Sequence, residues 1–209
     1  MQAFQNLDLD KLYRHCLRNV AYGLWGTSKP IAGTLAEQYL RGLGLRGPFP
    51  DTLGYCPSAW CAHYGDYSPS LIAPIHDNGK VVAISQTFLC AETLGPWRDL
   101  RGNPITETFG WPGMGAAMLT RPDVVLGLAP TPEAALAASE QLSLPVWSSC
   151  GLERLGSIWL PHDVTDLILF VDPDSDQEAA AAMRAKKRYR VAGRNVTIQS
   201  APSMARAAA

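Results

Sequence analysis

The strongest constraint on this chain is an apolar run at residues 167–171 that leads directly into a helix start. The run is Leu-Ile-Leu-Phe-Val, and a short apolar run rich in β-branched and aromatic residues predicts a buried strand. Ser175 and Glu178 follow with the spacing of a capping box, which predicts that a helix begins between them. The sequence therefore predicts a strand-to-helix junction at about residue 172.

Three acids stand at alternate positions of this junction: Asp172, Asp174 and Asp176. Open α/β sheets bind ligands at the carboxyl ends of their strands. Carboxylates on alternate residues of an extended segment can converge on a hard cation such as Mg²⁺. We therefore predict a metal site formed by these three aspartates. The simpler alternative is a solvated turn in which the acids cap the helix.

The surrounding sequence predicts a series of alternating strands and helices. Thr131, Pro132 and Glu133 combine a capping hydroxyl, a proline at the first helical position and an acid near the positive end of the helix dipole. A helix is therefore expected up to Leu142. Strands are expected at residues 124–128, 144–147, 167–171 and 195–198, with a turn or short helix at 151–155.

Upstream, the pattern predicts helices and one hairpin. Apolar residues at helical spacing indicate a helix at 7–25, and Thr34 with Glu37 predicts the start of a second helix that ends near residue 43. Asp77-Asn78-Gly79 is a strong hairpin signal between apolar strands at 71–75 and 80–89. Residues 46–70 and 91–112 are expected to form loops.

Composition limits the classes of function. The net charge is −1, so no global basic field attracts nucleic acid, and 47% hydrophobic residues suffice for a core. Five irregularly spaced cysteines do not suggest a disulfide framework. No membrane-length apolar run and no signal-peptide pattern is present, so a cytoplasmic protein without membrane contact is expected.

Three blocks of sequence carry a resemblance to a known family: residues 129–137 (APTPEAALA), 144–152 (LPVWSSCGL) and 170–176 (FVDPDSD). Their order and spacing are similar to those of Toprim domains, the metal-binding fold of bacterial primases and topoisomerases. The closer resemblance is to the primase-like Toprim proteins of phages, plasmids and other mobile elements, of the Toprim_3 and DUF7146 types. Residues 30–45 resemble the stretch that precedes their catalytic domain, so the resemblance covers about residues 20–200.

This resemblance implies an α/β fold, a Toprim-like Rossmannoid parallel sheet with flanking helices, preceded by an N-terminal helical and β-hairpin segment. It implies a division into residues 1–70, 71–122 and the Toprim-like domain at 123–200, followed by a disordered tail at 201–209. It also implies Mg²⁺ as the cofactor and Glu133, Asp172 and Asp174 as the catalytic candidates, although for Glu133 a stabilising position in the first helical turn is the simpler interpretation.

The sequence departs from the family at the positions that carry the chemistry. Pro130 stands where the family has its catalytic glutamate, and Thr131 stands at the glycine that follows. Phosphoryl transfer through Mg²⁺ needs carboxylates that hold the ion and a group that manages the proton, and a proline side chain does neither. Asp163 and Asp166 are considered as substitutes for the missing acid.

Three other groups of residues have both a functional and a structural interpretation. Cys150 could be a nucleophile, but a small buried residue is the favoured interpretation because no histidine partner is evident. A zinc site could be formed by Cys56, Cys61, His63 and His76, but the spacing of the two cysteines lacks the matching second pair of a zinc motif, so a site without zinc is favoured. The basic cluster is either a phosphate-binding surface or a solvated helix end, and its members are Arg184, Lys186, Lys187, Arg188, Arg190 and Arg194.

These observations lead to two functional hypotheses. The first is a catalytically degenerate primase-like protein of a mobile element that acts by binding DNA, a replication protein or a host factor. The second is an active Mg²⁺-dependent primase or nuclease that uses the remaining acids. A third hypothesis, a small-molecule binding module, rests on fold analogy alone.

Overall fold

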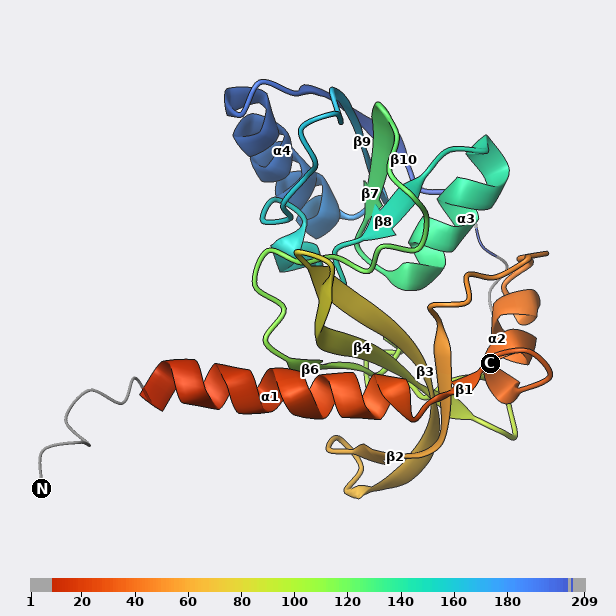
Figure 1. The fold of residues 1–209 in the computed structure, drawn as a ribbon. Helices are drawn as coiled ribbons and strands as arrows, with labels where there is room; N and C mark the ends of the chain where they lie inside the picture. Colours follow the sequence, from red (N-terminus) through yellow and green to blue (C-terminus); the bar gives the residue numbers. More distant parts are fainter. Residues whose placement is uncertain (1–8, 203, 205–209) are drawn as a thin grey trace, which may run out of the picture.

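The computed structural model describes residues 9–202 and 204, which form two sheets that share a core (Figure 1). The downstream sheet has four parallel strands in the spatial order β10-β9-β7-β8. These strands are β7 (Val125–Ala129), β8 (Val146–Ser148), β9 (Asp166–Val171) and β10 (Asn195–Ser200). All four were predicted from the sequence, with bounds within two residues of those observed.

Two helices cover the opposite faces of this parallel sheet. Helix α3 (Pro132–Leu142) connects β7 to β8, and α4 (Asp176–Val191) connects β9 to β10. The predicted cap of α3 is confirmed, because the Thr131 hydroxyl accepts a hydrogen bond from the Ala134 N–H at 3.2 Å. The 3-10 helix η1 (Leu152–Arg154) occupies the predicted turn after β8.

The upstream half forms an antiparallel sheet in the order β1-β2-β3-β4-β5, with β6 paired to β4. The hairpin prediction is confirmed: Asp77 pairs with Lys80, and Asn78 and Gly79 form the two-residue turn with positive φ angles. The strands are β1 (Lys29–Pro30), β2 (Gly54–Cys61), β3 (Asp66–Asp77), β4 (Lys80–Cys90), β5 (Gly95–Pro96) and β6 (Thr106–Gly110).

This sheet corrects the sequence-based description of the upstream half as mainly helices, loops and one hairpin. Residues 46–70 and 91–112 were expected to be loops, but they contain β2 and β6. The cause is tertiary pairing, since β2 and β6 add to the two outer edges of the β3–β4 hairpin. Strand β3 also crosses the predicted segment boundary at residue 70, although the division into segments itself stays a prediction.

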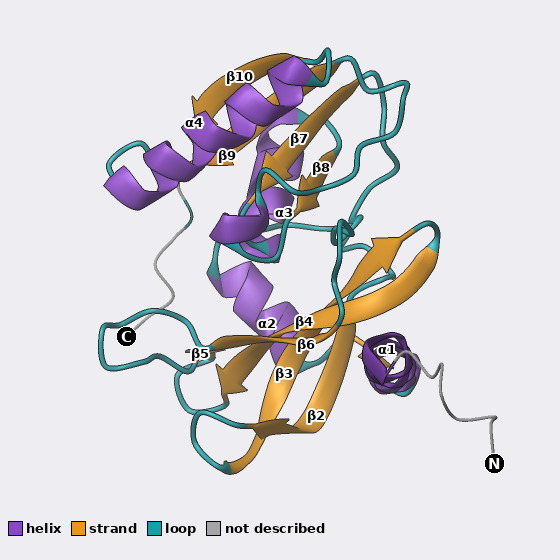
Figure 2. Ribbon diagram, turned by 90° about the vertical axis from the view of Figure 1, so that its left-hand side faces the viewer, coloured by secondary structure: helices purple, strands orange, loops and turns teal. Residues whose placement is uncertain are grey.

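Two helices flank the antiparallel sheet, as Figure 2 shows. Helix α1 (Leu9–Gly26) packs across β4 and β6, and α2 (Leu35–Gly42) lies near β3 and β4. The predicted capping box at α2 forms in an altered way, because Glu37 accepts a hydrogen bond from the Gly33 N–H rather than from Thr34. Residues 7 and 8 of the predicted first helix lie outside the described residues.

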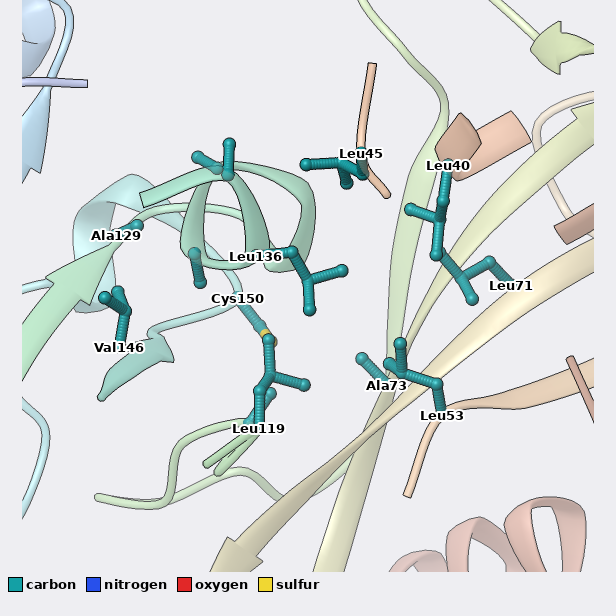
Figure 3. Packing of buried hydrophobic residues seen from close by; sticks show 14 of the residues in the cluster. Leu40, Leu45, Leu53, Leu71, Ala73, Leu119, Ala129, Leu136, Val146 and Cys150 are labelled. Carbon is teal, nitrogen blue, oxygen red and sulfur yellow. The ribbon is translucent and has the colours of Figure 1, made fainter. Parts of the chain in front are cut away.

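The largest hydrophobic core joins the two halves of the chain. Leu40, Leu71 and Ala73 from the upstream half pack in one buried cluster with Leu136 and Val146 from the downstream half (Figure 3). A second cluster lies between the other face of the parallel sheet and α4. The two halves are therefore held together by apolar contact over a continuous core.

Inside the parallel sheet, a glycine permits the closest packing. A Cβ atom added at Gly127 would lie 2.7 Å from the Phe170 ring and 2.8 Å from Val146, so only glycine fits under the fully buried phenyl ring. The Phe170 ring thus lies directly on the backbone of β7. This contact fixes the spacing of β7 and β9, whose ends carry the candidate site.

Most of the predicted disordered tail lies outside the described residues. Of the part that is described, Ala201 donates its N–H to the Val171 carbonyl at 2.9 Å, and Met204 packs against the shared core. Within the described residues, no helix is long and apolar enough to cross a membrane.

Candidate functional site

The candidate site lies where β7 and β9 end side by side. Because both strands are parallel, Pro130 at the end of β7 and Asp172 at the end of β9 come to the same edge of the sheet. A cavity of about 530 Å³ opens there. Pro130, Thr131, Asp172, Asp174 and Glu178 are among the residues that line it. The cavity thus has acids on the β9 side and uncharged residues on the β7 side.

Two of the acids of this cavity, Asp172 and Glu178, accept hydrogen bonds from backbone N–H groups. Asp172 Oδ1 accepts a hydrogen bond from the Asp174 N–H at 2.9 Å, and Glu178 Oε2 accepts one from the Asp172 N–H at 2.7 Å. The Ser175 hydroxyl accepts from the Glu178 N–H, which completes one half of the predicted capping box. The carboxylates therefore stabilise the strand-to-helix junction itself.

Two of the three predicted aspartates, Asp172 and Asp174, line the cavity, and Glu178 lines it in place of Asp176. Asp176 begins α4 and is exposed outside the lining of the cavity, whereas Glu178 faces into the cavity. Sequence reasoning used Glu178 only as a cap. Its position in the first turn of α4 was the available signal, because a side chain there can point back over the preceding strand end.

Glu133 lies apart from the other predicted catalytic residues, in the interface between the two halves. Its carboxylate is buried and accepts hydrogen bonds from the Thr87 hydroxyl at 2.9 Å and from the Tyr39 hydroxyl at 3.4 Å. Burial, together with the adjacent carboxylate, raises the pKa of Tyr39 far above its usual range, so the phenol remains a donor. Through these hydrogen bonds, Glu133 on α3 connects the downstream half to β4 and α2 of the upstream half.

Neither substitute considered for the missing acid is in the right place. Asp166 is the first residue of β9 and pairs with Val125 at the start of β7, so it lies at the opposite edge of the parallel sheet from Pro130. Its carboxylate accepts hydrogen bonds from Thr165 and Asn195. Asp163 precedes β9 on the same side. The suggestion that either residue replaces the family's glutamate is therefore wrong.

The residues present do not form a complete Mg²⁺ site. No group of three histidine, cysteine, aspartate or glutamate side chains is placed to hold a metal ion anywhere in residues 9–202. This applies to the predicted aspartate triplet and also to Cys56, Cys61, His63 and His76. Mg²⁺ keeps several waters and can be held by one or two carboxylates, so metal binding by Asp172 and Asp174 stays a prediction.

Cys150 has the properties of a structural residue. It is buried at the end of β8, and its Sγ lies 4.0 Å from the Ser148 carbonyl oxygen. Burial raises the pKa of the Cys150 thiol to about 11, so the nucleophilic thiolate is absent at neutral pH. Arg154 fixes the adjoining loop by donating to the carbonyl oxygens of Ser149 and Gly115.

We expect the native protein to protect Cys150 from alkylation at pH 8, because its thiol is both buried and protonated. Cys16, which is exposed on α1, should react within minutes and serves as the internal control. Mass spectrometry of peptides after a timed iodoacetamide pulse measures both sites. Labelling of Cys150 at the rate of Cys16 would contradict this assignment, and labelling of both in denaturant confirms that the reagent reaches them.

The predicted basic cluster lies on the C-terminal part of α4 and just beyond it. Arg184, Lys187, Arg188 and Arg190 are exposed, and α4 begins in acids at the cavity and ends in these cations. Among the described residues, none of the cluster's side chains is within ion-pair distance of a carboxylate. Arg188 donates to the Ser157 hydroxyl and Arg194 donates to the His162 carbonyl. The cluster is thus a solvated surface with unneutralised charge.

The chain has a primase-like Toprim fold, in which a parallel sheet with acids after β9 packs on an antiparallel sheet. The family model that matches is a domain of unknown function, DUF7146, over residues 17–105. That match covers the second half of α1, all of α2 and strands β1 to β5, and it ends before the parallel sheet begins.

Two solved structures have a similar fold. The structure of the DnaG catalytic core has a TM-score of 0.58 at 16% identity and covers 91% of this chain and 72% of that chain. The DnaG primase catalytic domain bound to ssDNA has a TM-score of 0.56 at 15% identity and covers 94% of this chain and 76% of that chain. At these identities the likeness concerns the fold alone. No curated protein matches the chain.

Proposed function

We propose that this chain is a catalytically degenerate primase-like protein of a mobile element that acts by binding DNA. The observation that carries the proposal is Pro130, which lines the cavity at the end of β7 and offers no carboxylate opposite Asp172 and Asp174. With acids on one side only, the cavity lacks the group that would manage a proton in phosphoryl transfer. We expect no template-directed primer synthesis with Mg²⁺ or Mn²⁺.

The proposed DNA-binding surface is the basic cluster on α4. Phosphate contacts by Lys and Arg supply most of the affinity in sequence-independent binding. Most cations of this cluster are exposed, and none forms an ion pair within the described residues. Aromatic side chains do not alternate with them on this surface, so binding there is led by phosphates rather than by base stacking. A replication protein or a host factor with an acidic surface would use the same cations.

A metal titration tests what remains of the acid site. If Asp172 and Asp174 hold Mg²⁺, a tenfold excess of metal over its Kd should raise the Tm by about 3–6 °C, and Asp172→Asn with Asp174→Asn should abolish the shift. Asp51→Asn with Asp163→Asn removes the same charge at exposed positions elsewhere and should keep it. A shift that survives in the Asp172/Asp174 double variant would refute metal binding at this site.

A second candidate function is an active Mg²⁺-dependent primase or nuclease. One observation favours it: Asp172, Asp174 and Glu178 line the same cavity, so its β9 side is acidic even though these residues do not form a three-carboxylate metal site within the described residues. Pro130→Glu would place an acid on the other side of the cavity. Primer synthesis or nicking by the natural chain would establish the second function, whereas activity only in Pro130→Glu would support degeneracy.

A further inference from the structure

A second cavity, of about 730 Å³, lies between α1 and the tip of the β3–β4 hairpin and shares no lining residue with the acid cavity. Helix α1 supplies one wall and the hairpin supplies the other, with Val81 and Val82 as apolar lining. This volume is in the range of small-molecule sites, which combine apolar walls with a few polar groups. Neither the acids nor the basic cluster described above contributes to it.

The cavity contains cationic and polar groups that have no protein partner. Nε of Arg18 and Nδ1 of His76 are buried, and neither has a hydrogen-bond partner among the described residues. Leaving such groups unpaired is costly, and a guanidinium is suited to a phosphate or carboxylate. Lys80 lines the same cavity, so two cations face one acid, Asp77. The cavity thus favours an anion.

Flat rings line the cavity next to these cations. Tyr22 and Trp25 lie with their ring centroids 6.1 Å apart, and the His76 ring lies edge-on to Trp25 at 6.2 Å. The Trp25 indole N–H donates to the Thr52 carbonyl at 2.9 Å, which fixes that ring in place. Burial lowers the pKa of His76, so at neutral pH its ring is an uncharged part of this wall.

We propose that this cavity binds a nucleoside phosphate, with the phosphate at Arg18 and Lys80 and the base against Tyr22 and Trp25. A base offers the flat face that aromatic side chains stack on, and its phosphate supplies an anion for the half-buried Arg18, whose Nε has no partner among the described residues. The source is either a free nucleotide or one nucleotide unit of a single strand, since both present the same chemistry. This site goes beyond the proposed function, because it shares no residue with α4 or with the acid cavity.

The test is calorimetric titration of AMP and of inorganic phosphate into the full chain, without divalent cations. AMP should bind at least about tenfold more tightly than phosphate because stacking adds to the phosphate contact. Arg18→Gln should weaken AMP binding by about 10- to 100-fold, as expected for loss of a hydrogen bond to a charged group. Arg14→Gln changes the same charge one turn earlier on α1, outside the cavity, and should bind AMP like the natural chain.

A second variant tests the base. Tyr22→Leu should reduce AMP affinity to that of inorganic phosphate and leave phosphate binding unchanged. Equal affinity for AMP and phosphate in the natural chain would overturn the nucleoside part of the proposal, and undiminished AMP binding by Arg18→Gln would overturn the site. The unliganded Arg18→Gln chain should melt within a few degrees of the natural chain, since the Nε group that it loses has no partner; a large drop in Tm would mean that Arg18 serves the fold instead.

Competition distinguishes the two sources of the nucleotide. A 5′-phosphorylated oligothymidine that displaces AMP would identify the ligand as a unit of a strand, and one that leaves AMP bound would identify a free nucleotide. The chain with α4 arginine and lysine residues replaced by glutamine should bind AMP normally in either case. Failure of DNA binding at α4 and failure of this cavity to bind AMP are therefore separate results.

Discussion

Replacing Arg184, Lys187 and Arg190 with glutamine should lower the affinity of this protein for single-stranded DNA about 100- to 1000-fold at about 50 mM salt. Each phosphate contact on a single strand adds about 0.7 to the slope of log affinity against log salt, so three lost contacts remove about two to three decades at this salt. Fluorescence anisotropy of a labelled oligonucleotide, repeated over a salt series, measures both the affinity and the slope.

The control for this variant is Lys29→Gln with Arg101→Gln and Arg121→Gln, which removes three exposed cations from other parts of the surface. Because the net charge changes equally, this control separates a local surface from the overall charge of the protein. Equal loss of affinity in both triple variants would place DNA binding elsewhere. Binding by the natural chain that is the same at low and high salt would contradict a phosphate-led mode.

Phe170→Ala should destabilise the protein by about 3–5 kcal/mol, the usual cost of removing a buried phenyl ring and leaving a cavity. The Phe170 side chain is fully buried and lies against Gly127 and the shared core, so its removal leaves a space that the rigid sheet cannot close. Urea denaturation monitored by circular dichroism gives the change in the free energy of unfolding.

Phe109→Ala is the matched control, because this phenylalanine lies on β6 with 38% of its surface exposed. It should cost less than half of the Phe170 value, since the lost contact with the protein is smaller. A similar loss of unfolding free energy for the two substitutions would mean that the contact between Phe170 and Gly127 does not contribute to stability as proposed.

The sequence was sufficient to predict the strands of the parallel sheet, because β7 and β9 are largely buried and appear as continuous apolar runs, while the edge strand β10 alternates apolar and polar residues. The antiparallel sheet was predicted only at its hairpin. Strand β2 contains Gly54 and Pro57, and its register with β3 shifts between Cys56 and Ala59. Glycine, proline and a bulge all weaken a strand signal, and pairing with β3 overcomes that local preference.

The part of the candidate site that was predictable is the part set by the ends of parallel strands. Adjacent β7 and β9 bring Pro130 and Asp172 to one sheet edge, although β8 lies between these strands in the sequence. The position of Glu133 was not predictable, because it is fixed by Thr87 and Tyr39, which lie 46 and 94 residues away along the chain. The resemblance to primases implied a catalytic Glu133. Its burial could not be foreseen, because it depends on partners that are distant in the sequence.

The core that Leu40, Leu71, Leu136 and Val146 share has a consequence for how this protein loses its structure. Since the largest apolar cluster draws on both sheets, neither sheet keeps its core when the other melts, and a single cooperative transition is expected. None of these contacts involves Asp172, Asp174 or Pro130. Substitutions of these three residues therefore leave the core contacts in place, so the fold does not depend on which side chains occupy these positions of the cavity.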